Sequence, residues 1–133
     1  MKDSVEKFKQ YIEQFDEDFD RVHAIMDLAQ KQTPFGSQPS TAVKVPGCQS
    51  TLWVWGQKTV CGHWHFHSTS DGLFTAGMAQ LALGAVNGHT SQELETLDIH
   101  WFDQLDLPGL ITGGRMNGFQ NLLKVVNGIV NQG

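Results

Sequence analysis

Hydrophobic residues along this chain follow helical spacing at both ends and strand-like spacing in the middle. Near the N-terminus they predict two helices (residues 3–15 and 17–32), the second ending before Thr33-Pro34 because a residue that precedes proline resists helical angles. Residues 72–86 are apolar on nearly every side and predict a buried central helix. Residues 115–130 carry a single apolar face and predict a last helix.

The middle of the chain predicts a small sheet. Leu52–Gly56 and Cys61–His67 are rich in aromatic and β-branched residues, and Thr41–Val45 is a weaker strand candidate. After these strands and the central helix, Thr90–Glu93 matches a capping box that opens a short helix. The order of helices, strands and helices predicts an α+β fold, in which an antiparallel sheet of two or three strands packs against helices. We expect residues 1–133 to form one domain.

Composition narrows the functional classes. The formal net charge of -5 and the 14 Asp and Glu residues against 9 Lys and Arg argue against a nucleic-acid binder, which normally carries a basic surface. No apolar run approaches the ~18 residues that a membrane-spanning helix needs, and the polar start of the chain is unlike a secretory signal. With only two cysteines, the chain is no disulfide scaffold, and we expect a protein of the reducing cytoplasm.

The two cysteines are predicted to lie far apart. A hairpin centred near Lys58-Thr59 places Cys61 opposite residues 56–57 and Cys48 opposite residues 69–70, beside the start of the central helix. Eight or so residues along a strand then separate the two sulfur atoms by roughly 25 Å, too far for a disulfide bond. We expect Ser70 or Asp71 to cap the central helix.

Cys48 lies where a turn meets a strand. Pro46-Gly47 predicts the turn, and the apolar strand that begins at Leu52 follows. The expected helix start nearby favours the thiolate, which is the reactive form of cysteine. The alternative from composition alone is a buried cysteine that acts as a small hydrophobic residue.

A second set of residues could bind a metal ion. Alternation along one strand would place Cys61, His63, His65 and His67 on the same face. Thiolate and imidazole are suitable zinc ligands, so a zinc-binding module or hydrolase is one hypothesis. The other is a polar sheet face exposed to solvent, with Trp64 and Phe66 turned toward the core.

The segment from Val45 to Ser50 (Val-Pro-Gly-Cys-Gln-Ser), followed by Trp53, resembles the active-site signature of the SufE family of sulfur acceptors, which includes SufE and CsdE proteins. Further matches follow in the family's order over about residues 19–130. They are Ser70-Asp71, Gly77, Leu105-Asp106-Leu107 and Gly114–Gly118 (Gly-Arg-Met-Asn-Gly).

The resemblance implies a persulfide carrier with a SufE/IscU-like fold. Cys48 would accept sulfur from a pyridoxal-phosphate cysteine desulfurase of the SufS or CsdA type, stimulate that enzyme, and pass the sulfur to an iron–sulfur cluster scaffold or another acceptor. The cofactor belongs to the desulfurase, and this chain would need none of its own. Such a protein is an activator and carrier more than a stand-alone enzyme.

Three residues are candidates to support Cys48, each with a structural alternative. Gln49 either hydrogen-bonds the sulfur or closes the turn. Asp71 either contacts the partner, as family likeness implies, or caps the helix. Arg115 could orient an acidic partner surface or stabilise sulfur charge, or it could form an ion pair within the fold. A remaining possibility is a small interaction domain in which Cys48 is inert.

Overall fold

The computed structural model describes residue 10 and residues 18–48, 50–95 and 113–132, with the backbone alone at residues 18, 19, 21 and 113–119. Apart from residue 10, the predicted helix over residues 3–15 lies outside the described residues, as does the family match at Leu105-Asp106-Leu107. The described elements are α2 (Asp18–Asp27), the 3-10 helix η1 (Leu28–Lys31), β1 (Val43–Lys44), β2 (Leu52–Lys58), β3 (Trp64–Ser70), α3 (Leu73–Val86), α4 (Ser91–Glu95) and α5 (Gly113–Gln132).

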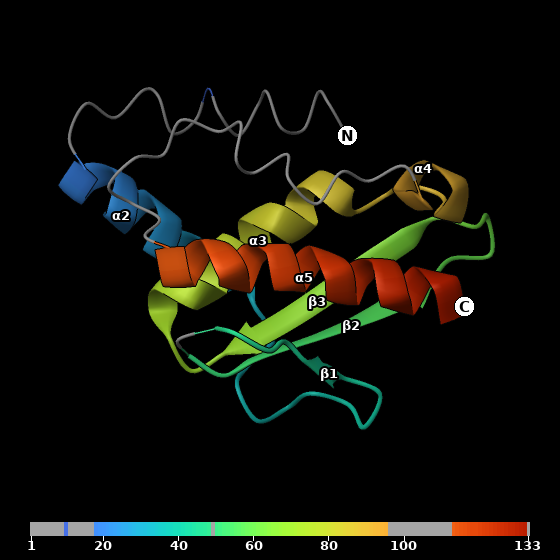
Figure 1. Cartoon of the computed structure of the whole chain (residues 1–133), viewed down its shortest axis with the longest axis horizontal. Coiled ribbons are helices and arrows are strands. Elements are labelled where there is room, and N and C mark those ends of the chain that lie inside the picture. Colours follow the sequence, from blue (N-terminus) through green and yellow to red (C-terminus); the bar gives the residue numbers. More distant parts are fainter. Residues whose placement is uncertain (1–9, 11–17, 49, 96–112, 133) are drawn as a thin grey trace.

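The sheet in this part of the chain has three antiparallel strands in the order β1-β2-β3, which confirms the predicted α+β fold. Helices α3 and α5 cover one face of the sheet (Figure 1). From the sheet, Val54 and Phe66 enter the same buried cluster as Met78 of α3 and Leu122 of α5. Helix α2 packs on α3, where Gly77 approaches the carbonyl oxygen of Ile25.

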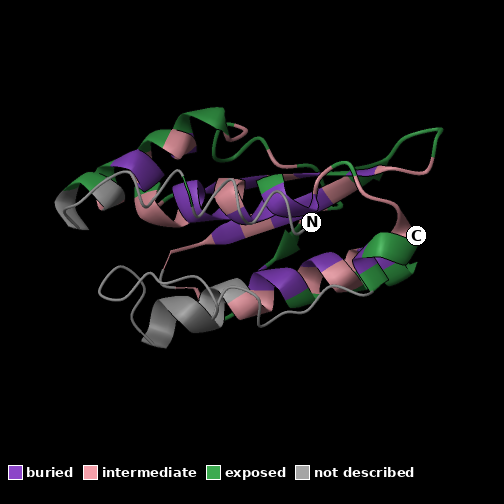
Figure 2. Cartoon of the chain, turned by 90° about the horizontal axis from the view of Figure 1, so that it is seen from above, coloured by how far each residue is buried: buried purple, intermediate pink, exposed green. Residues whose placement is uncertain are grey.

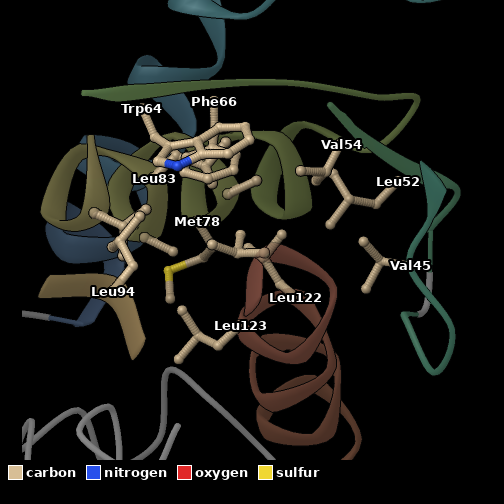
Figure 3. Packing of buried hydrophobic residues seen from close by; sticks show 14 of the residues in the cluster. Val45, Leu52, Val54, Trp64, Phe66, Met78, Leu83, Leu94, Leu122 and Leu123 are labelled. Atoms are coloured by element: carbon tan, nitrogen blue, oxygen red, sulfur yellow. The ribbon is translucent and has the colours of Figure 1, made fainter. Parts of the chain in front are cut away.

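The core is continuous from one end of the sheet to the other. Figure 3 shows Val45 and Leu52 at one end of the cluster and Trp64 with Leu94 at the other. Buried positions gather on α3, on β2 and β3, and along one side of α5 (Figure 2). The prediction of a buried central helix is confirmed, because α3 has a buried residue at most of its positions.

The predicted hairpin register is wrong. Strand β2 extends to Lys58, and Gly56 pairs with Phe66. The chain reverses over residues 59–63, where Thr59 N–H donates to the His63 carbonyl at 2.8 Å and Gly62 takes a φ of +85°. The turn therefore closes later than Lys58-Thr59, since glycine accepts this left-handed geometry easily. Cys61 consequently lies in the exposed turn, and the two cysteines are free.

The same shift changes what lies beside the loop that carries Cys48 (residues 46–51, called the cysteine loop below). Leu52 pairs with Ser70, so Cys48 lies beyond the paired strands and not opposite residues 69–70. The end of β3 is held by Gln32, whose side-chain amide donates to the Ser70 carbonyl at 3.2 Å and accepts from Ser70 N–H at 2.8 Å. This anchor fixes the strand end that leads into Asp71 and α3.

The prediction that Ser70 or Asp71 caps α3 is also wrong. The N-cap position is Gly72, and it makes no side-chain capping hydrogen bond. The Asp71 carboxylate instead accepts from the backbone of the cysteine loop, and the Ser70 hydroxyl accepts from Gly72 N–H at 3.2 Å. Asp71 lies one residue before the N-cap position, and its carboxylate bonds the neighbouring loop instead of the first turn of the helix.

Candidate functional site

The turn before Cys48 is fixed by its backbone. Val45 N–H donates to the Leu52 carbonyl at 2.9 Å, which closes residues 46–51 into a loop at the end of the sheet where α3 begins (Figure 1). Gly47 takes a φ of +77°, a conformation that side chains with a Cβ rarely adopt. The sequence prediction of a turn at Pro46-Gly47 is therefore confirmed, and this turn sets the direction in which Cys48 leaves the backbone.

Cys48 is half-buried and packs against the hydrophobic core. Its other side borders an open cavity of about 500 Å³ that is lined by residues 44–48, Ser50 and Thr51. Burial raises the pKa of the Cys48 thiol above its usual value, because desolvation disfavours the charged thiolate. The resting site thus favours the neutral thiol, although one side of the sulfur is accessible.

A tether from Asp71, just before α3, holds the C-terminal side of the cysteine loop. Thr51 N–H donates to Asp71 Oδ1 at 3.0 Å, across 20 residues of sequence. A carboxylate that accepts from a backbone amide forms a charge-assisted hydrogen bond, which is stronger than a neutral one. The structure therefore places Asp71, one of the sequence candidates, beside the Cys48 loop as a structural support.

A second tether comes from α5 and holds the N-terminal side of the loop. Asn121 Nδ2 donates to the Pro46 carbonyl oxygen at 2.8 Å. Sequence analysis missed Asn121, because 75 residues separate the two partners and no local pattern links them. It also missed Lys44, which is the charged residue among the described residues that line the cavity. Only the tertiary fold brings Asn121 to the site, whereas Lys44 lies four residues before Cys48 in the sequence.

Two of the sequence candidates are placed only in part. Gln49 lies outside the described residues, so no role for it is tested. Arg115 belongs to the first turn of α5, the helix whose residue Asn121 touches the cysteine loop, and its side chain is not described. Six residues of helix span about 9 Å, which puts the Arg115 backbone at the same end of the molecule as the loop.

The alternative hypothesis of a metal site on one strand face is not supported by the described residues. Strand β3 begins at Trp64, so Cys61 lies in the turn and His63 makes an isolated bridge with Thr90. His65 is exposed, and the His67 ring stacks on Trp55 at a centroid distance of 5.8 Å. No three His, Cys, Asp or Glu residues in the described part of the chain are grouped to hold a metal ion.

Trp64 and Phe66 are buried, as the alternative interpretation predicted for the core-facing side of this strand. Their rings stack at a centroid distance of 5.7 Å (Figure 3). Among the helices that the structure describes, none combines the length and the apolar character that a membrane span requires.

Comparison with known proteins identifies the family. A family model described as SufE, Fe-S metabolism associated domain, matches residues 6–130. The chain is 28% identical over 86 residues to the sulfur acceptor protein CsdE of Escherichia coli (strain K12), in an alignment that covers 64% of this chain and 58% of that protein. The alignment thus spans less than two thirds of CsdE.

The fold is also similar to the solution structure of a hypothetical protein from Thermus thermophilus. The TM-score is 0.78, and the match covers 97% of this chain and 94% of the other. At 14% identity this likeness concerns the fold alone. The family model covers nearly the whole sequence and includes the turn that carries Cys48. The chain therefore belongs to the SufE family of Fe-S metabolism associated domains.

Proposed function

We propose that this protein is a sulfur acceptor and carrier that works through Cys48. The observation that carries the proposal is the free, half-buried Cys48 thiol on a cavity of about 500 Å³, in a loop tethered to Asp71 before α3 and to Asn121 of α5. The SufE family match and the likeness to a protein named as a sulfur acceptor support the same chemistry.

The donor in this proposal is the cysteine persulfide of a desulfurase of the SufS or CsdA type, whose pyridoxal phosphate releases sulfur from cysteine. The Cys48 thiolate attacks the outer sulfur of the donor persulfide, and the sulfur–sulfur bond of the donor breaks. A new sulfur–sulfur bond forms on Cys48, the donor cysteine leaves as a thiolate, and it takes up the proton that Cys48 lost. The step is an exchange with no net oxidation, so it needs no added oxidant or reductant.

Removal of the persulfide frees the desulfurase cysteine for another cycle, and this accounts for the proposed stimulation of that enzyme. The half-buried position of Cys48 limits the access of small reductants to the bound sulfur. The sulfur then passes by the same exchange to an iron–sulfur cluster scaffold or another thiol acceptor. A reducing compartment such as the cytoplasm, which keeps Cys48 as a thiol, suits this cycle.

The surface beside the cysteine loop offers a contact for the partner. Leu73, in the first turn of α3, is 59% exposed, and Pro46 and Gly47 are exposed on the loop itself. Leu73 follows Gly72, which lies against Ser50 of the loop, so a desulfurase that reaches Cys48 would also meet this leucine. We expect Leu73→Glu to weaken stimulation of the desulfurase while the folded protein keeps its melting temperature.

The test is a sulfur-transfer assay with purified candidate desulfurases. The protein is incubated with desulfurase, cysteine and a thiol-alkylating probe, and peptides are analysed by mass spectrometry. We expect an additional sulfur atom on the Cys48 peptide, none in Cys48→Ser, and normal loading in the matched control Cys61→Ser. A Cys48 that stays unloaded beside several active desulfurases would overturn the proposal and favour an interaction domain with an inert cysteine.

A further inference from the structure

Asn121 lies against both residues that precede Cys48. Its Nδ2 donates to the Pro46 carbonyl at 2.8 Å, and an ideal Cβ built on Gly47 would lie 2.5 Å from the same nitrogen. The amide therefore occupies the space next to Gly47 that any other residue would need. The neighbours Leu122 and Leu123 are fully buried, so the core fixes the position of Asn121 on α5.

The two tethers of the cysteine loop are not equivalent. Asp71 holds Thr51, which lies three residues after Cys48, with residues 49 and 50 between them. Asn121 holds Pro46, only two residues before Cys48, and covers Gly47, the residue immediately before it. The placement of the sulfur consequently depends most directly on Asn121.

We propose that Asn121 is a positioning residue that keeps the Pro46-Gly47 turn in place, so that Cys48 stays packed against the core and its sulfur is shielded. This inference deepens the proposed sulfur-carrier function and rests on it for its biological meaning. A shielded sulfur keeps a bound persulfide from reductants, and the same shielding slows the reaction of the free thiol. Asn121 would set the balance between protection of the persulfide and reactivity of the free thiol.

The described charged groups around the loop are Lys44, which lines the cavity, and Asp71, which accepts from Thr51. Neither residue forms a described hydrogen bond with Asn121, so a substitution at Asn121 disrupts no described hydrogen bond of either charged group. The effect of the change is therefore on the exposure of Cys48. Greater exposure removes the desolvation that raises the pKa of the thiol.

The first experiment measures the alkylation of Cys48 by iodoacetamide as a function of pH in a Cys61→Ser background, where Cys48 is the reacting cysteine. We expect Asn121→Ala to raise the rate at neutral pH severalfold and to move the pH profile to lower pH. Asn121→Leu keeps most of the volume without the N–H donor, and we expect a similar rise. Asn131→Ala, at an exposed position of the same helix, should leave the profile unchanged.

A general loss of stability could also expose Cys48, and a second control separates this cause. Glu93→Gln weakens α4, at the opposite end of the molecule from the loop (Figure 1). If Glu93→Gln accelerates alkylation as much as Asn121→Ala at an equal loss of melting temperature, Asn121 has no specific role. Unchanged alkylation in folded Asn121→Ala and Asn121→Leu would overturn the proposal as well.

A double-mutant cycle tests the contact itself. Gly47→Ala should lower the melting temperature of the parent protein, because its Cβ would displace the Asn121 amide and alanine is strained at the positive φ of this position. In Asn121→Ala the same substitution should lower it less, since only the strain of the positive φ remains. Additive effects would contradict the close contact between Gly47 and Asn121.

Sulfur loading separates this inference from the proposed function. With a desulfurase that loads the protein, we expect the Cys48 persulfide of Asn121→Ala to be reduced by dithiothreitol severalfold faster than that of the parent. If no desulfurase loads Cys48, the carrier function fails, while the alkylation profiles still decide whether Asn121 positions the thiol. If loading succeeds and the profiles do not change, the role of Asn121 fails alone.

Discussion

The backbone N–H of Thr51 donates a 3.0 Å hydrogen bond to Oδ1 of Asp71, and this bond joins the loop after Cys48 to the start of α3. Asp71 therefore connects two elements instead of capping its own helix. Together with the bond from Asn121 to Pro46, it holds the cysteine loop on both sides. We therefore expect the reactivity of Cys48 to depend on these two hydrogen bonds.

Removal of the Asp71 tether should loosen the loop. We expect Asp71→Ala to lower the free energy of unfolding by about 1 kcal/mol, the usual net worth of one hydrogen bond, and to speed alkylation of Cys48. Asp71→Asn keeps an oxygen acceptor and should retain most of the stability and the slow alkylation. Urea denaturation and alkylation kinetics check both. Equal behaviour of the alanine and asparagine variants would show that the bond to Thr51 does not matter.

The two cysteines should differ in reactivity. Cys61 is exposed in the β2–β3 turn, whereas Cys48 is half-buried and burial raises its pKa. At neutral pH we expect iodoacetamide to modify Cys61 faster than Cys48, because Cys61 is exposed whereas burial both restricts access to Cys48 and disfavours its thiolate. The rate at Cys48 should climb as the pH rises toward its raised pKa. Peptide mapping by mass spectrometry gives both rates in one sample, and faster labelling of Cys48 would contradict the burial.

We expect the close packing of α2 against α3 to require glycine at position 77. A Cβ at Gly77 would overlap the Ile25 carbonyl, so Gly77→Ala must push α2 away from α3. We expect a loss of roughly 1–3 kcal/mol in unfolding free energy, as for other overpacked cores. The matched control is Gly84→Ala in the same helix, where nothing lies within 4 Å and helix propensity predicts a gain of roughly 0.5–1 kcal/mol. Equal effects at both positions would be inconsistent with this packing.

The capping box of α4 should make the folded protein less stable as the pH falls into the acid range. Thr90 N–H donates to Glu93 Oε1 at 2.9 Å, and Glu93 N–H donates to Thr90 Oγ1 at 3.3 Å. The backbone bond from Thr90, with smaller effects of His89 and the Thr90 hydroxyl, lowers the pKa of Glu93 from 4.5 to about 2. Because the folded-state pKa lies below that of the unfolded chain, the stabilisation is present above pH 4.5 and is lost as the pH falls toward 2.

We expect Glu93→Gln to weaken this dependence. Melting temperatures measured across acid pH should show a smaller decrease in the variant than in the parent over that interval, with the two curves converging at the acid end. An identical pH dependence in both proteins would mean that Glu93 is not held by the cap. The sequence motif at residues 90–93 predicted this capping box, and the hydrogen bonds confirm it.

Local patterns predicted much of the fold but not its register. The nearly continuous apolar character of residues 72–86 identified the central helix, observed at Leu73–Val86, because a helix without a polar face must be buried. The hairpin was misplaced because the β-branched residues Thr59 and Val60 continue the strand-like composition into the turn. The hydrogen bond from Thr59 to His63 and the positive φ of Gly62 show where the chain reverses. The metal hypothesis lost its basis with the predicted register, because that hypothesis required Cys61 and His63 to belong to the strand.

The sequence by itself determined the α+β class, the turn before Cys48, the capping box and membership of the SufE family, because these depend on residues close together in the chain or on their order. The tertiary structure decided which distant groups meet that turn. Asp71 reaches it from the start of α3 and Asn121 from α5, and the burial of Cys48 depends on the packing of the whole core. Contacts between segments 20 and 75 residues apart leave no local pattern, since they arise only when the helices settle on the sheet.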